Sequence, residues 1–369
     1  MGFRLSAFYF AFFAYAGAYV AYFPLYLAGR GLGAVEIAWV LALPPLVRIV
    51  APGAWGWLAD RTGAHRAIVA FSCAVTALAF GLLPFTEHIA VLIALMSAFS
   101  AGALPIVEAI TLGSLAGQPG RYGPIRLWGS VGFIAVVLAG GVWLDFQPVS
   151  TLPAMLVVFA LLMLAVALAL PSIKPLGLSQ EATFRVSPEV RALFAAGFCN
   201  AVAHGALYAF LSLHLEALGY SATTIGMLWT AGVLAEILVF LYLPQLFQRF
   251  ALSSVLVASL LLGVVRFAAI GWAAGEAWIV LLAQLLHAAT FGSFHAASVA
   301  AVQRVFPEGA QARGQTLFSG LTYGAGAAAG LVLAGWAWAG GGAPLAFSIA
   351  ALAALSGAFF ARQLKRAGL

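Results

Sequence analysis

The sequence predicts an all-α membrane protein in which twelve transmembrane helices form two pseudo-symmetric six-helix bundles. Composition is the first reason: 64% of the 369 residues are hydrophobic and 8% are charged, whereas soluble domains carry about 25% charged residues. The second reason is that apolar runs close to the ~20 residues of a spanning helix repeat along the whole chain. The third is a single long polar stretch, 172–192, with six apolar runs on either side of it.

The apolar runs give the expected helices in order. The chain has 40 glycines and 16 prolines, and those inside the apolar runs fit transmembrane helices that pack closely on one another. The expected spans are 5–29, 36–58, 67–86, 89–115, 127–145, 151–171, 193–216, 223–247, 251–273, 277–303, 314–338 and 343–362.

The basic residues set the expected orientation. With the N-terminus inside, fourteen Lys and Arg lie in cytoplasmic segments and one, Arg30, lies outside. The positive-inside rule therefore places both termini in the cytoplasm. The sequence pI of about 9.6 does not indicate a nucleic-acid partner, because the basic residues are spread over short loops and form no patch. The cytoplasmic set is Arg4, Arg61, Arg66, Arg121, Arg126, Lys174, Arg185, Arg191, Arg249, Arg304, Arg313, Arg362, Lys365 and Arg366.

The two halves of the chain repeat. We expect bundles at 1–171 and 193–369, joined by a cytoplasmic linker at 172–192. When the first half is shifted by 188 positions, Leu27 and Gly31 fall on leucine and glycine, and Arg48 falls on Glu236. One pseudo-equivalent position thus carries opposite charges in the two halves. Parallel repeats of this kind hold a substrate near the membrane midplane and rock one half against the other.

Four ionisable side chains lie deep in apolar runs: Arg48, Glu108, Glu236 and Arg266. A charge at the bilayer centre costs about 2.5–3.5 kcal/mol even on insertion scales, so such residues generally face a polar cavity and carry function. The alternative is a static buried ion pair that holds helices in register. Burial favours the neutral form of a carboxyl and a nearby arginine favours the charged form, so a moving arginine could switch proton affinity at either glutamate.

A short motif follows the second span. It resembles the signature loop of the major facilitator superfamily, G-x-L-A-D-R-x-G-x-x-R. The resemblance and the position between two spans predict a cytoplasmic gate; the alternative is a loop that only fixes topology. The motif residues are Gly56, Asp60, Arg61, Gly63 and Arg66.

The string from Tyr122 to Phe133 is the most specific in the chain. It is similar to the aromatic-G-x-x-R-x-x-G-x-x-G string of the lactose permease and phenylpropionate permease branches of that superfamily. The resemblance implies the major facilitator fold and covers nearly the whole chain. It is closest to the bacterial phenylpropionate permease group, which 232–236, 263–266, 284–287 and Arg48 also resemble.

Resemblance to the lactose permease branch implies functional roles for three residues in the first half of the chain. The string 105–109 matches its P-x-V-E-A motif, which implies that Glu108 pairs with Arg126 in binding sugar hydroxyls. The ring that would stack on a sugar is Phe133 here. Arg126 could instead be only a loop anchor.

In the second half, the same resemblance implies a coupling network of Glu236, Arg266 and His287. Two positions depart from that branch. Its proton-releasing carboxylate is Thr290 here, and its sugar-binding asparagine is Val239. These departures weaken a sugar substrate and leave the proton carrier open among the buried glutamates and histidines.

Further candidates come from residue type and spacing. Arginine suits a substrate carboxylate because its planar fork makes two parallel bonds, so Arg48 and Arg266 are candidate substrate ligands. His295 lies eight residues beyond His287 on the same helix face and joins it as a candidate proton-coupling residue. Tyrosines recur at helical spacing in the first span, where Tyr19 and Tyr22 are candidate ligands for an aromatic solute, although ordinary helix packing with interfacial anchoring is the preferred explanation of the pattern. His204 is a further intramembrane histidine.

Together these patterns predict a secondary active transporter in a bacterial inner membrane. We expect proton-coupled symport of a small organic solute by a monomer, with an aromatic carboxylate of the phenylpropionate type as the substrate implied by resemblance. A sugar or nucleoside symporter and an exporter of hydrophobic compounds are the alternatives. No catalytic triad, phosphate loop or metal-ligand cluster is visible in the sequence, so we expect neither an enzyme nor a cofactor or metal.

Overall fold

The computed structural model describes residues 2–115, 119–171 and 186–367. These residues form helices and short connections, and no β-strand occurs among them. Eleven helical segments of the described chain are long and apolar enough to cross a membrane. The prediction of an all-α membrane protein is confirmed.

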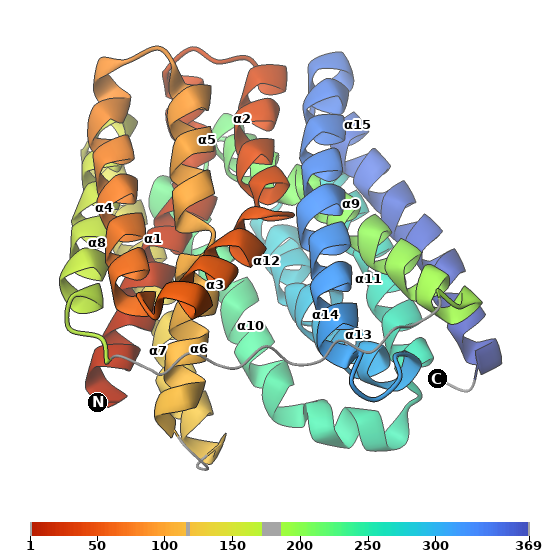
Figure 1. The fold of residues 1–369 in the computed structure, drawn as a ribbon. Helices are drawn as coiled ribbons and strands as arrows, with labels where there is room; N and C mark the ends of the chain where they lie inside the picture. The colour runs from red at the N-terminus through yellow and green to blue at the C-terminus, as the bar shows by residue number, and fades with distance from the viewer. Residues whose placement is uncertain (1, 116–118, 172–185, 368–369) are drawn as a thin grey trace. The chain divides into compact units, whose positions relative to one another are not determined.

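The first part of the chain forms eight α-helices (Figure 1). They are α1 (Gly2–Gly29), α2 (Ala34–Val47), α3 (Ala51–Thr62), α4 (His65–Leu82), α5 (Ile89–Ser100), α6 (Ala103–Leu115), α7 (Tyr122–Phe146) and α8 (Leu152–Ala167), with 3₁₀ turns η1 (Leu83–Phe85), η2 (Pro119–Arg121) and η3 (Val149–Thr151).

The second part contains seven α-helices, two π-helical segments and a terminal 3₁₀ turn. They are α9 (Pro188–Ala217), α10 (Ala222–Arg249), α11 (Leu252–Ala273), α12 (Ala277–Leu285), the π segment η4 (Ala288–Ser293), α13 (Phe294–Val305), α14 (Gln311–Ser319), the π segment η5 (Gly320–Gly326), α15 (Ala327–Gln363) and η6 (Leu364–Ala367).

The sequence predicts twelve membrane spans and the described chain has eleven helical segments, because the last segment contains two of the predicted spans. It runs for 53 residues from Gln311 to Gln363, which would measure about 80 Å as one straight helix, against a hydrocarbon core of about 30 Å. Gly341 and Gly342 interrupt α15 with non-helical backbone, and Gly342 has φ +62° and ψ −155°, a conformation open essentially to glycine alone. This break falls between the predicted spans 314–338 and 343–362.

Two predicted spans contain a break that the apolar pattern does not reveal. The span expected at 36–58 is divided at 48–50 into α2 and α3, three residues after the Pro44–Pro45 pair. The span expected at 89–115 is divided at 101–102 into α5 and α6. Proline interrupts the backbone hydrogen bonding of a helix interior, which accounts for the first break.

The described chain divides into two compact units. Unit 1 holds 2–31, 47–115, 119–171 and 221–226, and unit 2 holds 32–46, 186–220 and 227–367. The predicted boundary at 172–192 stays a prediction, because 172–185 lies outside the described residues.

Each unit has its own apolar core. In unit 1, α1 packs along α7 and α8, and α4 lies beside α8 (Figure 1). Leu5, Val69, Val107 and Met163 are buried in its core. In unit 2, α15 packs along α9 and α11, with a core that includes Leu193, Leu256, Phe294 and Phe318.

The string 122–133 lies in helix α7, not in a loop, and its glycines serve helix packing. A Cβ at Gly132 would lie 2.1 Å from the carbonyl oxygen of Phe10 on α1, and one at Gly129 would lie 2.7 Å from the Phe13 ring. Only glycine permits this approach of the two helices. Helix α7 therefore begins five residues before the start at 127 that the apolar pattern predicts, and Arg126 is a helix residue.

Candidate functional site

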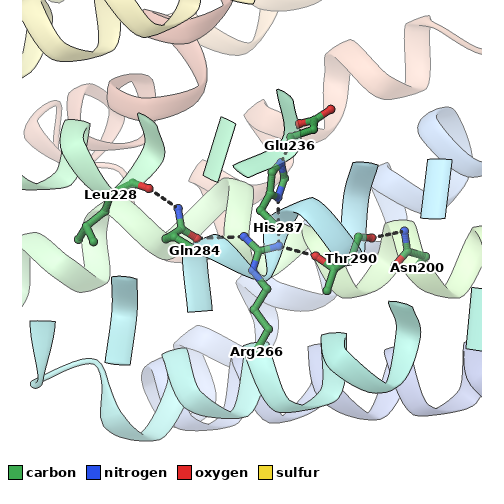
Figure 2. A network of polar contacts seen from close by, with 7 residues as sticks. All are labelled: Asn200, Leu228, Glu236, Arg266, Gln284, His287 and Thr290. Carbon is green, nitrogen blue, oxygen red and sulfur yellow. Dashed lines mark hydrogen bonds and ion pairs between the residues drawn. The ribbon is translucent and has the colours of Figure 1, made fainter. Parts of the chain in front are cut away.

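Arg266 lies at the centre of a buried polar network in unit 2 (Figure 2). Its side chain, on α11, is fully buried. The guanidinium Nη2 donates to Gln284 Oε1 at 2.9 Å, and Nη1 donates to Thr290 Oγ1 at 2.8 Å and to His287 Nδ1 at 3.1 Å. These acceptors stabilise the buried terminal nitrogens, whereas the buried Nε of Arg266 has no hydrogen-bond partner among the described residues.

The contact with Arg266 determines which nitrogen of His287 carries a proton. Arginine has donors and no acceptor, so Nδ1 must accept, and the neutral ring bears its hydrogen on Nε2. That Nε2 faces Glu236 Oε2 at 3.5 Å (Figure 2). His287 thus connects Arg266 to Glu236, and a second proton on Nδ1 would oppose the arginine N–H.

Two further amides complete the network. Gln284 Nε2 donates to the Leu228 carbonyl at 3.2 Å, and Asn200 Nδ2 donates to the Thr290 carbonyl at 3.4 Å. Gln284 and Thr290 are each 1% exposed or less. The network therefore fixes residues of α9, α10 and α11 around the middle of the tenth predicted span.

A π-helical segment shapes that span. Polar residues Gln284, His287 and Thr290 all reach Arg266, and η4 begins directly after His287. A π turn is wider than an α turn and occurs frequently at functional sites. The local change of winding lets the three side chains converge on one guanidinium.

Three aromatic rings extend the network along the tenth span. His287 stacks on Phe291 with ring centroids 5.1 Å apart, and Phe291 stacks on His295 at 6.3 Å. His295 Nδ1 lies 2.7 Å from the hydroxyl of Tyr323, in the second π segment η5. His204 is buried with Nδ1 on the Asn200 carbonyl at 2.8 Å, and its ring lies 6.3 Å from that of His287.

A separate ionic pair lies in unit 1. Arg126 Nε is 3.8 Å from Glu108 Oε1, and each side chain is about one-third exposed. The guanidinium lies over the Phe13 ring at 4.2 Å and near the Tyr9 ring at 5.2 Å. Stacking on aromatic faces orients a guanidinium and leaves its edge for other acceptors. Phe133, the predicted stacking ring, is half-buried on the same helix, α7.

Arg48 lies in the break between α2 and α3 and is exposed. Its charge acts on the hydroxyls of Tyr15 and Tyr19 from α1. Among the described residues no hydrogen bond or ion pair of its side chain occurs. Non-helical backbone at membrane depth is tolerated only where it is buried in protein or lines a water-filled cavity. The break and its exposed cation therefore indicate a cavity lining.

The predicted tyrosine ligands differ in their surroundings. Tyr19 stacks on Phe23 at 4.6 Å, and among the described residues its buried hydroxyl has no hydrogen-bond partner. Tyr22 is fully buried, and its hydroxyl donates to the Val137 carbonyl on α7 at 2.5 Å. The Tyr22 hydroxyl is thus occupied by backbone, as helix packing would require.

The gate motif is the end of one helix and the start of the next, not a loop as the sequence suggested. Gly56, Asp60 and Arg61 are in α3, whereas Arg66 is in α4. Gly63 closes α3 with φ +68°, and its N–H donates to the Ala59 carbonyl at 2.8 Å. Such a left-handed cap is a common end for a helix.

The acidic residue of that motif has a partner that the sequence did not suggest. Asp60 Oδ1 lies 3.2 Å from Nε2 of the buried His65, in the first turn of α4. Arg61 lies over the Trp57 ring at 5.2 Å. The gating role of the motif stays a prediction.

The structure brings together Glu236, Arg266 and His287, and separately Glu108 and Arg126. Sequence reasoning missed Gln284 and Asn200, and treated Thr290 only as a lost carboxylate. The spacing of Gln284, His287 and Thr290, three residues apart within one apolar run, was a signal that could have found two of them.

The eleven apolar helical segments of the described chain define a class: a multi-pass membrane protein. The model of the MFS_1-like family matches residues 3–349. The chain belongs to this family and is a transporter of the major facilitator type, not an enzyme.

Individual relatives agree with this class. A curated protein of Escherichia coli K12 with the name "Probable 3-phenylpropionic acid transporter" is 28% identical over 306 residues, which cover 79% of each chain. A maltose permease of Geobacillus stearothermophilus is 28% identical over 333 residues, covering 87% of this chain and 83% of the relative. The solved structure of the nucleoside transporter NupG matches with a TM-score of 0.83 at 18% identity, over 99% of this chain and 98% of the other.

Proposed function

We propose that this transporter is a proton-coupled symporter of a small aromatic carboxylate. The observation that carries the substrate class is the exposed Arg48 in the break of the second span, within electrostatic range of the hydroxyls of Tyr15 and Tyr19. A guanidinium binds a carboxylate in two bonds, and the neighbouring rings suit an aromatic body. The name of the Escherichia coli relative supports this class.

In this proposal Arg266 serves the coupling network and not the substrate. It is fully buried, and its terminal nitrogens already donate to Gln284, Thr290 and His287. Arg48, unlike Arg266, has no hydrogen bond or ion pair of its side chain among the described residues and is therefore available to a substrate. The stacked Tyr19, with its unmatched buried hydroxyl, is the aromatic ligand that we assign beside Arg48.

We assign the coupling proton to Glu236. The carboxylate faces the N–H of His287, and Arg266 opposes a second proton on that histidine. Protonation of Glu236 weakens its attraction to His287, which links proton binding to the position of the ring. His287 is then a positioning residue, and His295 with Tyr323 supports the same span.

The setting that we propose for this activity follows from the charges in the loops. Fourteen basic residues in the segments assigned to the cytoplasm, against Arg30 outside, support a cytoplasmic position for both termini. Membership of a family with bacterial relatives favours the bacterial inner membrane, and a monomer suffices for the mechanism.

The substrate proposal is tested by counterflow in proteoliposomes with 3-phenylpropionate and with its uncharged amide. Arg48→Gln should weaken transport of the acid at least about tenfold, the equivalent of one charge-assisted hydrogen bond, and leave any transport of the amide unchanged. Arg304→Gln, at an exposed arginine in the last turn of α13, is the matched control. Equal transport of the acid by the Arg48 variant and the wild type would exclude Arg48 as the ligand.

The coupling proposal is tested by uptake against a concentration gradient under an imposed pH gradient. Glu236→Gln should abolish uphill uptake and retain counterflow, because the amide cannot carry the proton. Glu276→Gln, at an exposed glutamate before α12, should behave as wild type. Uphill uptake that survives in the Glu236 variant would refute the assignment.

A sugar or nucleoside substrate is the second candidate, favoured by the Glu108–Arg126 pair in unit 1. A carboxylate next to a guanidinium can accept from and donate to neighbouring hydroxyls of one ligand. The maltose permease and nucleoside transporter relatives support this candidate. Counterflow of maltose or a nucleoside, lost in Arg126→Gln and kept in Arg48→Gln, would establish it in place of the carboxylate.

A further inference from the structure

Two adjoining hollows lie on unit 2 where α9 begins. The larger, about 470 Å³, lies between α9, α14, η5 and α15 and is lined by Phe194, Phe198, Cys199, Leu317, Leu321 and other side chains. The smaller, about 300 Å³, is bounded by Pro188 and Gln363. Arg191, Ala195 and Phe360 line both hollows. The larger one falls in the range of about 300–1,000 Å³ that small-molecule sites span.

The two hollows differ in chemistry. Arg191 is the charged residue of the larger hollow, whose other walls are apolar or aromatic. The smaller hollow adds the amide of Gln363 at the end of α15. From Arg191 to Cys199 the larger hollow follows α9 for eight residues, which is about 12 Å along the helix axis. A ligand that fits both parts has a polar end at Arg191 and an apolar end near Cys199.

The polar end carries a net positive charge. The segments 187–191 and 360–365, which border the smaller hollow, contain the cations Arg191, Arg362 and Lys365 and the carboxylate Glu189. The Ser187 hydroxyl, the Glu189 backbone N–H and the charge of Arg191 hold the pKa of Glu189 below its usual value, so it counts as one negative charge. The charge balance favours an anion.

We propose that these hollows form a binding site for an anionic phospholipid, with the phosphate at Arg191 and one acyl chain in the larger hollow. Arg191 lies at the predicted cytoplasmic end of its span, where arginine extends its charged head toward the interface. Basic pockets between helices at this depth bind anionic headgroups. The site is separate from Arg48 and from the Arg266 network, so it does not depend on the proposed substrate.

The lipid would act on the polar network through the walls of the larger hollow. Leu321 belongs to η5, the π segment whose Tyr323 contacts His295. Cys199 precedes Asn200, which donates to the Thr290 carbonyl. An acyl chain packed against Leu321 and Cys199 would therefore stabilise both η5 and the helix turn that carries Asn200.

The natural cysteines give a direct test. The chain has two: Cys199 lines the larger hollow, whereas Cys73 is 2% exposed in the core of unit 1 and serves as internal reference. The full-length protein in neutral detergent is treated with a maleimide in the presence of phosphatidylglycerol or of phosphatidylcholine with the same acyl chains. Peptide mass spectrometry then gives the alkylation rate of each cysteine.

We expect phosphatidylglycerol to protect Cys199 at about a fivefold lower concentration than phosphatidylcholine, which corresponds to about 1 kcal/mol for one basic residue at a lipid surface. Arg191→Gln should abolish this preference. Arg249→Gln, at another exposed arginine of the same unit, should retain it. Equal protection by both lipids, or a preference that survives in the Arg191 variant, would overturn the proposal and leave a hollow that any acyl chain fills.

Discussion

Replacement of Gln284 by leucine tests whether Arg266 is held by neutral acceptors. The side chain is 1% exposed; it accepts from Arg266 at 2.9 Å and donates to the Leu228 carbonyl at 3.2 Å. Leucine has a similar volume, so the substitution removes two hydrogen bonds and leaves the packing. It also leaves a guanidinium N–H and a carbonyl buried without their partner.

The magnitude follows from these two bonds. Hydrogen bonds between membrane helices contribute about 0.6 kcal/mol on average and about 1.7 at most. The bond to the charged Arg266 belongs near the upper value, so together the two give about 2 kcal/mol. At about 2 °C per kcal/mol for a large chain, the unfolding midpoint should fall by about 4 °C.

The assay is thermal unfolding of the purified protein in neutral detergent, followed by tryptophan fluorescence. Gln303→Leu, at an exposed position of α13 in the same span, is the matched control and should change the midpoint by less than about 1 °C. If the two variants unfold at the same temperature, Gln284 does not stabilise Arg266 and the network as described is refuted.

Two further predictions concern backbone geometry and helix capping. Gly342→Ala should lower the unfolding midpoint by the equivalent of about 1–3 kcal/mol, because the backbone conformation of Gly342 is strained for any residue with a Cβ. The control is Gly340→Ala, where an added Cβ meets only a Leu345 methyl at 3.8 Å, and it should have a smaller effect. Equal shifts of the midpoint in the two variants would contradict this reasoning. Asp145→Asn should lower the free energy of unfolding by about 1 kcal/mol, because the Asp145 carboxylate accepts from the first backbone N–H groups of α10 at 2.7 and 3.2 Å. The control Glu87→Gln, at an exposed position, should leave the unfolding midpoint unchanged. An unchanged midpoint for Asp145→Asn would refute the capping role.

The helices and their order were predictable because a membrane span leaves a strong signal. An apolar run of sufficient length has few other structural solutions. The meeting of Glu236, Arg266 and His287 was also within reach, since a resemblance carried these residues as a set and the structure places them in one network.

The finer features of the site were not predictable from the pattern. The break at 48–50 follows a proline pair inside an otherwise apolar run, and a hydropathy profile does not reveal such a break. Thr290 was interpreted as the loss of a carboxylate, whereas its hydroxyl accepts from Arg266. Such roles depend on which side chains meet across helices, and a single sequence does not specify these contacts.

The start of α7 was misplaced for a related reason. The glycines and the arginine of 122–133 are typical of a loop in a hydropathy profile, but the structure uses Gly129 and Gly132 for a close approach to α1. Small residues in membrane helices often serve packing instead of ending the helix.

The π segment η4 has a consequence for how this chain relates to others. A π turn holds one residue more than the α turn that it replaces, so 288–293 is equivalent to a single-residue insertion within the tenth span. A relative with a regular helix there should align with a one-residue gap between His287 and His295. The distance between these histidines along the sequence, and not only their identity, is therefore a marker by which chains with the same arrangement can be recognised.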